Sequence, residues 1–175
     1  MVTVSPSGNT TTAVTYTPIA TQTLGSAAAS VTFSSIPGTY KDLVLVCNYG
    51  MSVVANVPIL RFNSDSGSNY SQTSIYGNGT SAASGRDTNN SGVYFLDFLG
   101  TGGITNICNS IIQIMNYANT TTYKTTLMRD NDSSKGTDAS VGLWRNTAAI
   151  TTIGIVANAN NINSGSTFTL YGIGA

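Results

Sequence analysis

Histidine and glutamate are both absent from this sequence of 175 residues, so that its seven acidic residues are all aspartates. Without histidine the chain lacks the commonest general base and the commonest transition-metal ligand. No GxSxG or SxxK motif is present to activate a serine, and the GTGG segment at 100–103 lacks the lysine of a phosphate-binding loop. These absences predict a protein that is not an enzyme and holds no cofactor or metal. A polysaccharide lyase or hydrolase is the enzymatic alternative.

Charged side chains are scarce as well. They make up 8% of the residues, and seven basic residues balance seven acidic ones. Because there is no excess positive charge to bind phosphates, nucleic acids and anionic membranes are not expected partners. A surface with so few charges has little protection against association, so we expect much of it to be covered in an assembly.

Signals for secretion and membrane insertion are also missing. The N-terminal sequence MVTVSPSGNTTT has neither the basic nor the apolar region of a signal peptide, so synthesis in the cytoplasm is expected. No apolar run approaches the roughly 18 residues that span a bilayer. The two cysteines, Cys47 and Cys108, lie in apolar runs rather than in a CxxC motif. They are predicted to be buried, reduced thiols, with a disulfide as the alternative.

What the sequence does contain is a repeated alternation of apolar and polar residues, rich in β-branched side chains. This pattern predicts an antiparallel β-sandwich or barrel of about ten or eleven strands and no helix. Residues 77–92 show no apolar spacing and are predicted to form a long surface loop. Residues 1–12 are predicted to be an extended arm, followed by a single domain over 13–175. The predicted strands are 13–19, 30–36, 42–49, 57–62, 72–77, 93–99, 109–117, 123–130, 139–146, 150–158 and 166–173.

The stretch LRFNSDSGSNYS, residues 60–71, is the first candidate site. Asn63, Asp65 and Asn69 alternate around Gly67, which is the spacing of the first half of a calcium-binding loop. A calcium loop ends in a bidentate acid, but Ser74 stands at that position and Asp65 is the only carboxylate. The stretch is therefore predicted to be a turn, in which these side chains cap backbone amides.

A second candidate is RDNDSSKG, residues 129–136, in which two carboxylates stand two residues apart. Asp130 and Asp132 could hold a metal ion or act as an acid and base pair. Arg129 and Lys135 flank them and offer ordinary ion pairing. We predict a surface turn here.

Aromatic side chains could serve as platforms on which sugar rings stack. Tyr70 and Tyr76 flank the predicted loop, and together with Arg86 and Asp87 they form the candidate glycan-contact region. The remaining large rings are expected to fill the core between the sheets. The predicted core rings are Phe62, Phe95, Trp144 and Tyr171.

Three stretches of the chain resemble a known group of proteins. They are TLGSAAASVTFSSIPGTYKDLVLV (23–46), LRFNSDSGSNYS (60–71) and GSTFTLYGI (165–173). In combination they resemble small virion proteins and tail-fibre domains of tailed bacteriophages, notably phages of cyanobacteria. The resemblance implies a jelly-roll-like β-sandwich that assembles as a trimer on the exterior of the virion, without enzymatic activity. No functional residues carry over, because the matching positions are strand cores and a turn.

The favoured hypothesis is a capsid decoration, or cement, protein. Its partners would be further copies of itself, as a homotrimer, and the major capsid protein. The arm, with Val2, Val4 and Pro6, is suited to lying on a neighbouring subunit as an added strand. Two alternatives stay open: a tail-fibre or receptor-binding module whose 77–92 loop contacts host glycans, and a stand-alone carbohydrate-binding module.

Overall fold

The structure, a computed structural model, describes residues 2–4, 10–12, 16–101 and 107–174. These residues form fourteen strands and no helix, and every strand pair is antiparallel. Within the described ranges, no helix has the length and hydropathy that a membrane crossing requires. The prediction of an all-β antiparallel sandwich is confirmed.

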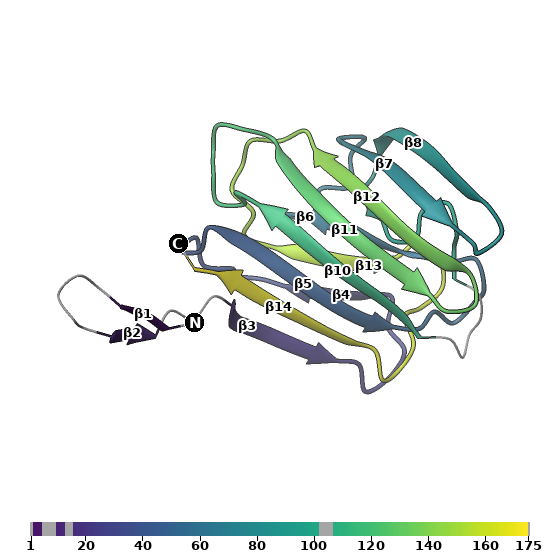
Figure 1. Cartoon of the computed structure of the whole chain (residues 1–175), viewed down its shortest axis with the longest axis horizontal. Helices are drawn as coiled ribbons and strands as arrows, with labels where there is room; N and C mark the ends of the chain where they lie inside the picture. The colour runs from purple at the N-terminus through teal and green to yellow at the C-terminus, as the bar shows by residue number, and fades with distance from the viewer. Residues whose placement is uncertain (1, 5–9, 13–15, 102–106, 175) are drawn as a thin grey trace.

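The sandwich consists of one large and one small sheet (Figure 1). Across the eight-stranded sheet the order is β3 (Tyr16–Thr23), β14 (Thr167–Ile173), β5 (Asp42–Tyr49), β10 (Cys108–Met115), β11 (Lys124–Asp132), β12 (Gly136–Trp144), β7 (Tyr70–Gly77) and β8 (Ala82–Asn90). Across the four-stranded sheet the order is β4 (Ser30–Phe33), β13 (Ile153–Ala157), β6 (Pro58–Phe62) and β9 (Val93–Tyr94). A separate pair joins β1 (Val2–Val4) to β2 (Thr10–Thr12).

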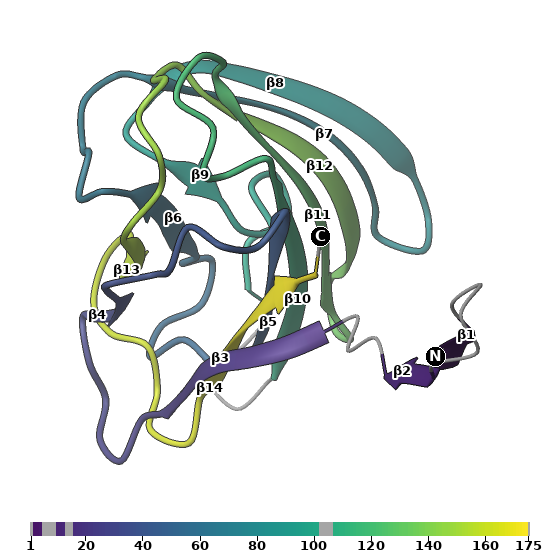
Figure 2. The ribbon, with the colours of Figure 1, turned by 90° about the vertical axis from the view of Figure 1, so that its left-hand side faces the viewer.

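The chain winds between the two sheets in the manner of a jelly roll. Strands β3 to β7 alternate between the large and the small sheet, and β12 to β14 do the same on the return. The first and last strands of the sandwich, β3 and β14, therefore lie side by side at one edge of the large sheet. Figure 2 shows the small sheet covering one face of the large sheet, which curves away from it toward β7 and β8.

The core lies between the sheets and follows from strand alternation. In β11 every second side chain from Lys124 to Asp132 is buried, and those in between are exposed. The ring of Trp144 packs against Phe62 and Tyr70, with centroid separations of 5.6 Å and 6.2 Å. Of the four rings predicted for the core, three are fully buried, whereas Tyr171 is half-buried beside Tyr16.

The predicted surface loop at 77–92 is wrong for most of its length, because Ala82–Asn90 forms β8. This strand is the outermost of the large sheet and pairs with β7. Its side chains are exposed or half-buried throughout, so the sequence carries no apolar alternation. Backbone hydrogen bonds to β7, which require no particular side chain, hold the strand in place.

The predicted strand at 93–99 is shorter than expected. Only Val93–Tyr94 pairs with β6, as β9, and the chain then turns over residues 95–99. Phe95 and Leu96 are nevertheless fully buried. The apolar run therefore serves as a cover over the inner face of the large sheet, and burial alone does not require a strand.

Figures 1 and 2 show β1 and β2 lying apart from the two sheets. Val2, Thr3 and Val4 pair with Thr12, Thr11 and Thr10. Pro6 lies outside the described residues. The contact role of the arm remains a prediction.

Candidate interaction surface

The outer face of the large sheet carries two rows of mainly apolar side chains that no described element covers. Both rows run across β5, β10, β11, β12 and β7 at matched register positions. Five of the aliphatic side chains are between 37% and 65% exposed, namely Val46, Ile75, Ile111, Leu127 and Val141. One row consists of Val46, Ile111, Arg129, Ala139 and Ile75, and the other of Val44, Gln113, Leu127, Val141 and Thr73.

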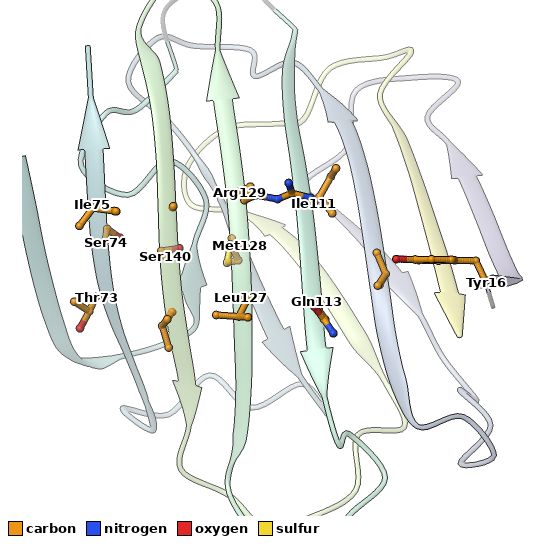
Figure 3. Close-up of a pocket in the computed structure, with 13 residues that line it drawn as sticks. Tyr16, Thr73, Ser74, Ile75, Ile111, Gln113, Leu127, Met128, Arg129 and Ser140 are labelled. Atoms are coloured by element: carbon orange, nitrogen blue, oxygen red, sulfur yellow. The ribbon is translucent and has the colours of Figure 1, made fainter. Parts of the chain in front are cut away.

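All residues of these two rows except Val46 line a hollow of about 590 Å³, which we call the outer hollow (Figure 3). The hollow exists because the large sheet is twisted and curved. Its β7 end bends away from the small sheet, so the outer face of the large sheet is concave. Figure 3 shows the side chain of Tyr16 extending from β3 toward the rows, which closes the hollow on that side. The sheet thus presents a concave apolar surface.

Polar side chains border the outer hollow. Along one end, Asn48 Nδ2 donates to Asn109 Oδ1 at 3.1 Å, and Asn109 Nδ2 donates to Asn131 Oδ1 at 3.4 Å. Near the β3 edge, the hydroxyls of Thr23 and Thr167 lie 3.1 Å apart. A row of polar side chains therefore bounds the apolar surface at this end.

The chemistry of the outer hollow suits a polypeptide better than a sugar. Its lining is mainly aliphatic, with Arg129 as its one charged residue and Tyr16 as its one aromatic residue. A sugar site needs aromatic faces for stacking and several converging polar groups. An apolar segment of a protein needs neither.

The candidate glycan residue Tyr70 is fully buried, so its predicted role is wrong. Its hydroxyl accepts a hydrogen bond from Phe62 N at 3.0 Å and donates to Asp65 O at 3.2 Å. Burial raises the pKa of this hydroxyl well above its usual range. Tyr70 follows a polar turn in the sequence, but β7 directs it inward against Trp144.

The other three candidates do not form one surface. Tyr76 stacks on Phe98, with ring centroids 5.4 Å apart, and Asp87 contacts the carboxyl of Asp97 on the inner side. Arg86 is exposed, and its strand position opposite Thr73 places it on the outer side of the sheet. The alternation of β7 and β8 thus separates residues that are close in sequence.

The prediction of a turn around Asp65 is confirmed. Its Oδ1 accepts a hydrogen bond from Gly67 N at 2.8 Å, and its Oδ2 accepts from Asn69 Nδ2 at 2.9 Å and from Trp144 Nε1 at 2.7 Å. Burial would raise the pKa of Asp65, but these three donors outweigh it and hold the pKa below the usual value. The carboxylate is used to join the turn to the core.

The predicted surface turn at Asp130 and Asp132 is wrong in one respect, because both carboxyls are buried. Asp130 is 1% exposed and Asp132 is 0% exposed. They occupy inward positions of β11, and the turn itself comes after them, at 133–135. Residues that are two positions apart in a strand point to the same face, and here that face is turned toward the core.

The prediction of two buried, unpaired thiols is confirmed for Cys47 and Cys108. Among the described residues, no group of three or more Cys or Asp side chains is arranged to hold a metal ion. The rows on the outer face were not singled out from the sequence. Their signal is a run of adjacent apolar residues, as in Ile111-Ile112 and Leu127-Met128, which is typical of strands covered on both faces.

No protein-family model and no curated protein sequence matches this chain.

Proposed function

We propose that the protein is a non-enzymatic structural subunit of a phage virion, a capsid decoration protein that docks onto neighbouring subunits through its outer hollow. The observation that carries this proposal is the set of five exposed aliphatic side chains in the two rows across the large sheet. The three stretches that resemble phage virion proteins support the choice of assembly. The absence of histidine and glutamate from the whole sequence supports a role without catalysis.

The occupant of the outer hollow would be an apolar polypeptide segment of an adjacent subunit in the particle. The hollow contains a single charged residue, Arg129, so a segment with at most one acidic group complements it. Highly charged or strongly polar segments would lose their hydration without finding partners. The small number of charges on the rest of the chain likewise lowers the cost of covering it.

Docking at this surface would be weak for one subunit and effective in an array. Fully burying an aliphatic side chain contributes about 1.5–3 kcal/mol, so five half-exposed side chains contribute roughly 5 kcal/mol before the cost of association. A subunit that binds only assembled neighbours stabilises the assembly by mass action. Trimer formation, which the phage resemblance implies, would multiply the effect.

Substitutions in the outer hollow test the proposal. In the variant with Leu127→Asp and Val141→Asp, two carboxylates would face the docked segment, and binding to capsids that lack the protein is expected to be lost. Thr125→Asp is the matched control, because Thr125 is exposed on the same face of β11 but does not line the hollow. Co-sedimentation with purified capsids measures binding, and circular dichroism confirms that each variant is folded.

The proposal fails if the wild-type protein neither co-sediments with capsids nor self-associates, or if the hollow variant and the control bind equally well. Binding to a glycan array that the hollow variant retains would favour the receptor-binding alternative. The copy number per virion separates a decoration protein, with hundreds of copies, from a tail component.

A further inference from the structure

Two buried carboxyls face each other across the inner side of the large sheet. Asp130 of β11 and Asp138 of β12 are direct register partners, and they are 1% and 2% exposed. Side chains at such positions lie about 5 Å apart. Neither carboxyl oxygen of Asp138 has a hydrogen-bond partner among the described residues. Ser110 of β10 is the next residue along the same inner row.

A second carboxyl pair lies beside the first. Burial raises the pKa of the Asp97 carboxyl, and the neighbouring charge of Asp87 on β8 raises it further. The charge of Asp138 also reaches Asp97. The four carboxyls therefore form one cluster, which we call the carboxyl cluster.

The segment 95–99 covers this cluster and is attached to it. Leu96 N donates to Asp130 Oδ2 at 3.3 Å, and Asp97 belongs to the segment itself. On either side, Phe95 packs edge-on against Tyr49 and Phe98 stacks on Tyr76. Leu96 has a φ of 45°, a left-handed conformation that is strained for a leucine. The closed segment therefore depends on its contacts to overcome local strain.

Ionisation of the carboxyl cluster would be strongly unfavourable. Two like charges about 5 Å apart in a poorly solvated interior repel each other far more than in water. Burial raises the pKa of Asp130 and of Asp97 to about 7 and that of Asp138 to about 6. No lysine or arginine in the described ranges offsets these charges.

The other titratable groups that face Asp130 do not compensate either. They are the hydroxyl of Tyr49 and the thiols of Cys47 and Cys108, and burial raises the pKa of each well above the usual value. Asp132, on the same face of β11, adds a further carboxyl that accepts from Cys108 Sγ at 3.4 Å. The surroundings of the cluster are neutral or acidic.

We propose that the carboxyl cluster is a proton-dependent latch, which holds the 95–99 segment closed over β11 and β12 while protonated and releases it when the protons are lost. This inference is independent of the proposed function. Asp97, Asp130 and Asp138 bind their protons more tightly in the closed state than in the open state, so closure is favoured in acid. Closure weakens as the pH rises above about 4, where the carboxyls of the open state lose their protons. It stops weakening near pH 7, where the carboxyls of the closed state lose theirs as well.

Hydrogen exchange of the full-length protein between pH 5 and 8, corrected for the intrinsic pH dependence of amide exchange, tests the latch. The opening constant of the 95–99 segment is expected to rise about tenfold per pH unit for each carboxyl that titrates, and then to level off near pH 7. Peptides from the small sheet, β4, β6 and β13, are expected to show no such rise. A rise shared by all peptides would mean global unfolding and would overturn the latch.

Variants locate the effect. Asp130→Asn and Asp97→Asn each remove one titrating group. In each variant the tenfold rise in the opening constant per pH unit that this group contributes should be lost. Asp42→Asn, on β5 and outside the cluster, is the matched control and should keep the wild-type slope. Should Asp130→Asn fail to fold, Asp87→Asn tests the half-buried member of the cluster. Removing the Asp87 charge stabilises the ionised Asp97 in the closed state, so the opening constant should level off at a lower pH and at a smaller value.

Two results would contradict the latch. One is exchange in the 95–99 segment that stays constant over the whole pH range. The other is restoration of protection at pH 8 by millimolar calcium or magnesium, with reversal by EDTA, which would show that the cluster holds a cation instead of protons.

Discussion

The Asp65 carboxylate is the best place to measure how a surface turn stabilises this fold. It accepts hydrogen bonds from a buried indole, a side-chain amide and a backbone amide, at 2.7, 2.9 and 2.8 Å. Replacing it by alanine removes all three and leaves Trp144 Nε1 buried without a partner. Trp144 is 1% exposed, so water cannot readily substitute.

The expected loss can be estimated bond by bond. An unsatisfied buried donor costs about 1–3 kcal/mol, and the two more exposed hydrogen bonds contribute about 0.5–1 kcal/mol each. Asp65→Ala is therefore expected to lower the free energy of unfolding by about 2–5 kcal/mol. Asp65→Asn should lose less, because an amide oxygen can still accept one of the three bonds.

Urea denaturation followed by tryptophan fluorescence measures this directly, since Trp144 is the only tryptophan in the chain. Ser66→Ala is the matched control: the residue is exposed in the same turn, and its change should stay within about 0.5 kcal/mol. A loss below about 0.5 kcal/mol for Asp65→Ala would refute the reasoning, because it would mean that the turn and the indole are held by other contacts.

The pH dependence supplies a second check on the same residue. The three hydrogen bonds keep the pKa of folded Asp65 below its unfolded value, so its contribution is present above the unfolded pKa. That contribution is lost as the pH falls through the lowered folded value. The difference in stability between wild type and Asp65→Asn should therefore shrink in strong acid.

Two further predictions concern the backbone and the thiols. Gly136 has a φ of 144°, and a Cβ there would overlap the carbonyl oxygen of Gly77, so Gly136→Ala should lower the free energy of unfolding by about 3 kcal/mol or more in a urea titration. Gly25→Ala, where a Cβ meets open space, should leave stability nearly unchanged, and equal losses in the two variants would contradict the assignment. Cys47 and Cys108 are 1% and 0% exposed, and burial raises the pKa of both thiols, so Ellman's reagent at pH 8 should label them only after denaturation. Rapid labelling of the native protein would show that the sandwich opens readily near β10.

The large and small sheets could be predicted because most of their strands alternate between a buried and an exposed face. The pattern in β11 and β14 is strict enough to place both strands within a few residues. The Asp65 turn could be predicted equally well, since an aspartate two residues before a glycine can cap the turn through local hydrogen bonds alone. These features depend on near neighbours in the chain, and local sequence therefore determines them.

The strand β8, the burial of Tyr70 and the carboxyl cluster could not be predicted in this way. β8 is held by backbone bonds to β7, and Tyr70 is buried because Trp144, 74 positions later, packs against it. Asp87, Asp97, Asp130 and Asp138 come from three strands and a turn, and only the pairing of β11 with β12 brings two of them face to face. The sequence by itself determined the strand content, the alternation and the local turns of this protein. The outer hollow and the carboxyl cluster were decided by tertiary structure, because sheet curvature and strand register place distant side chains together.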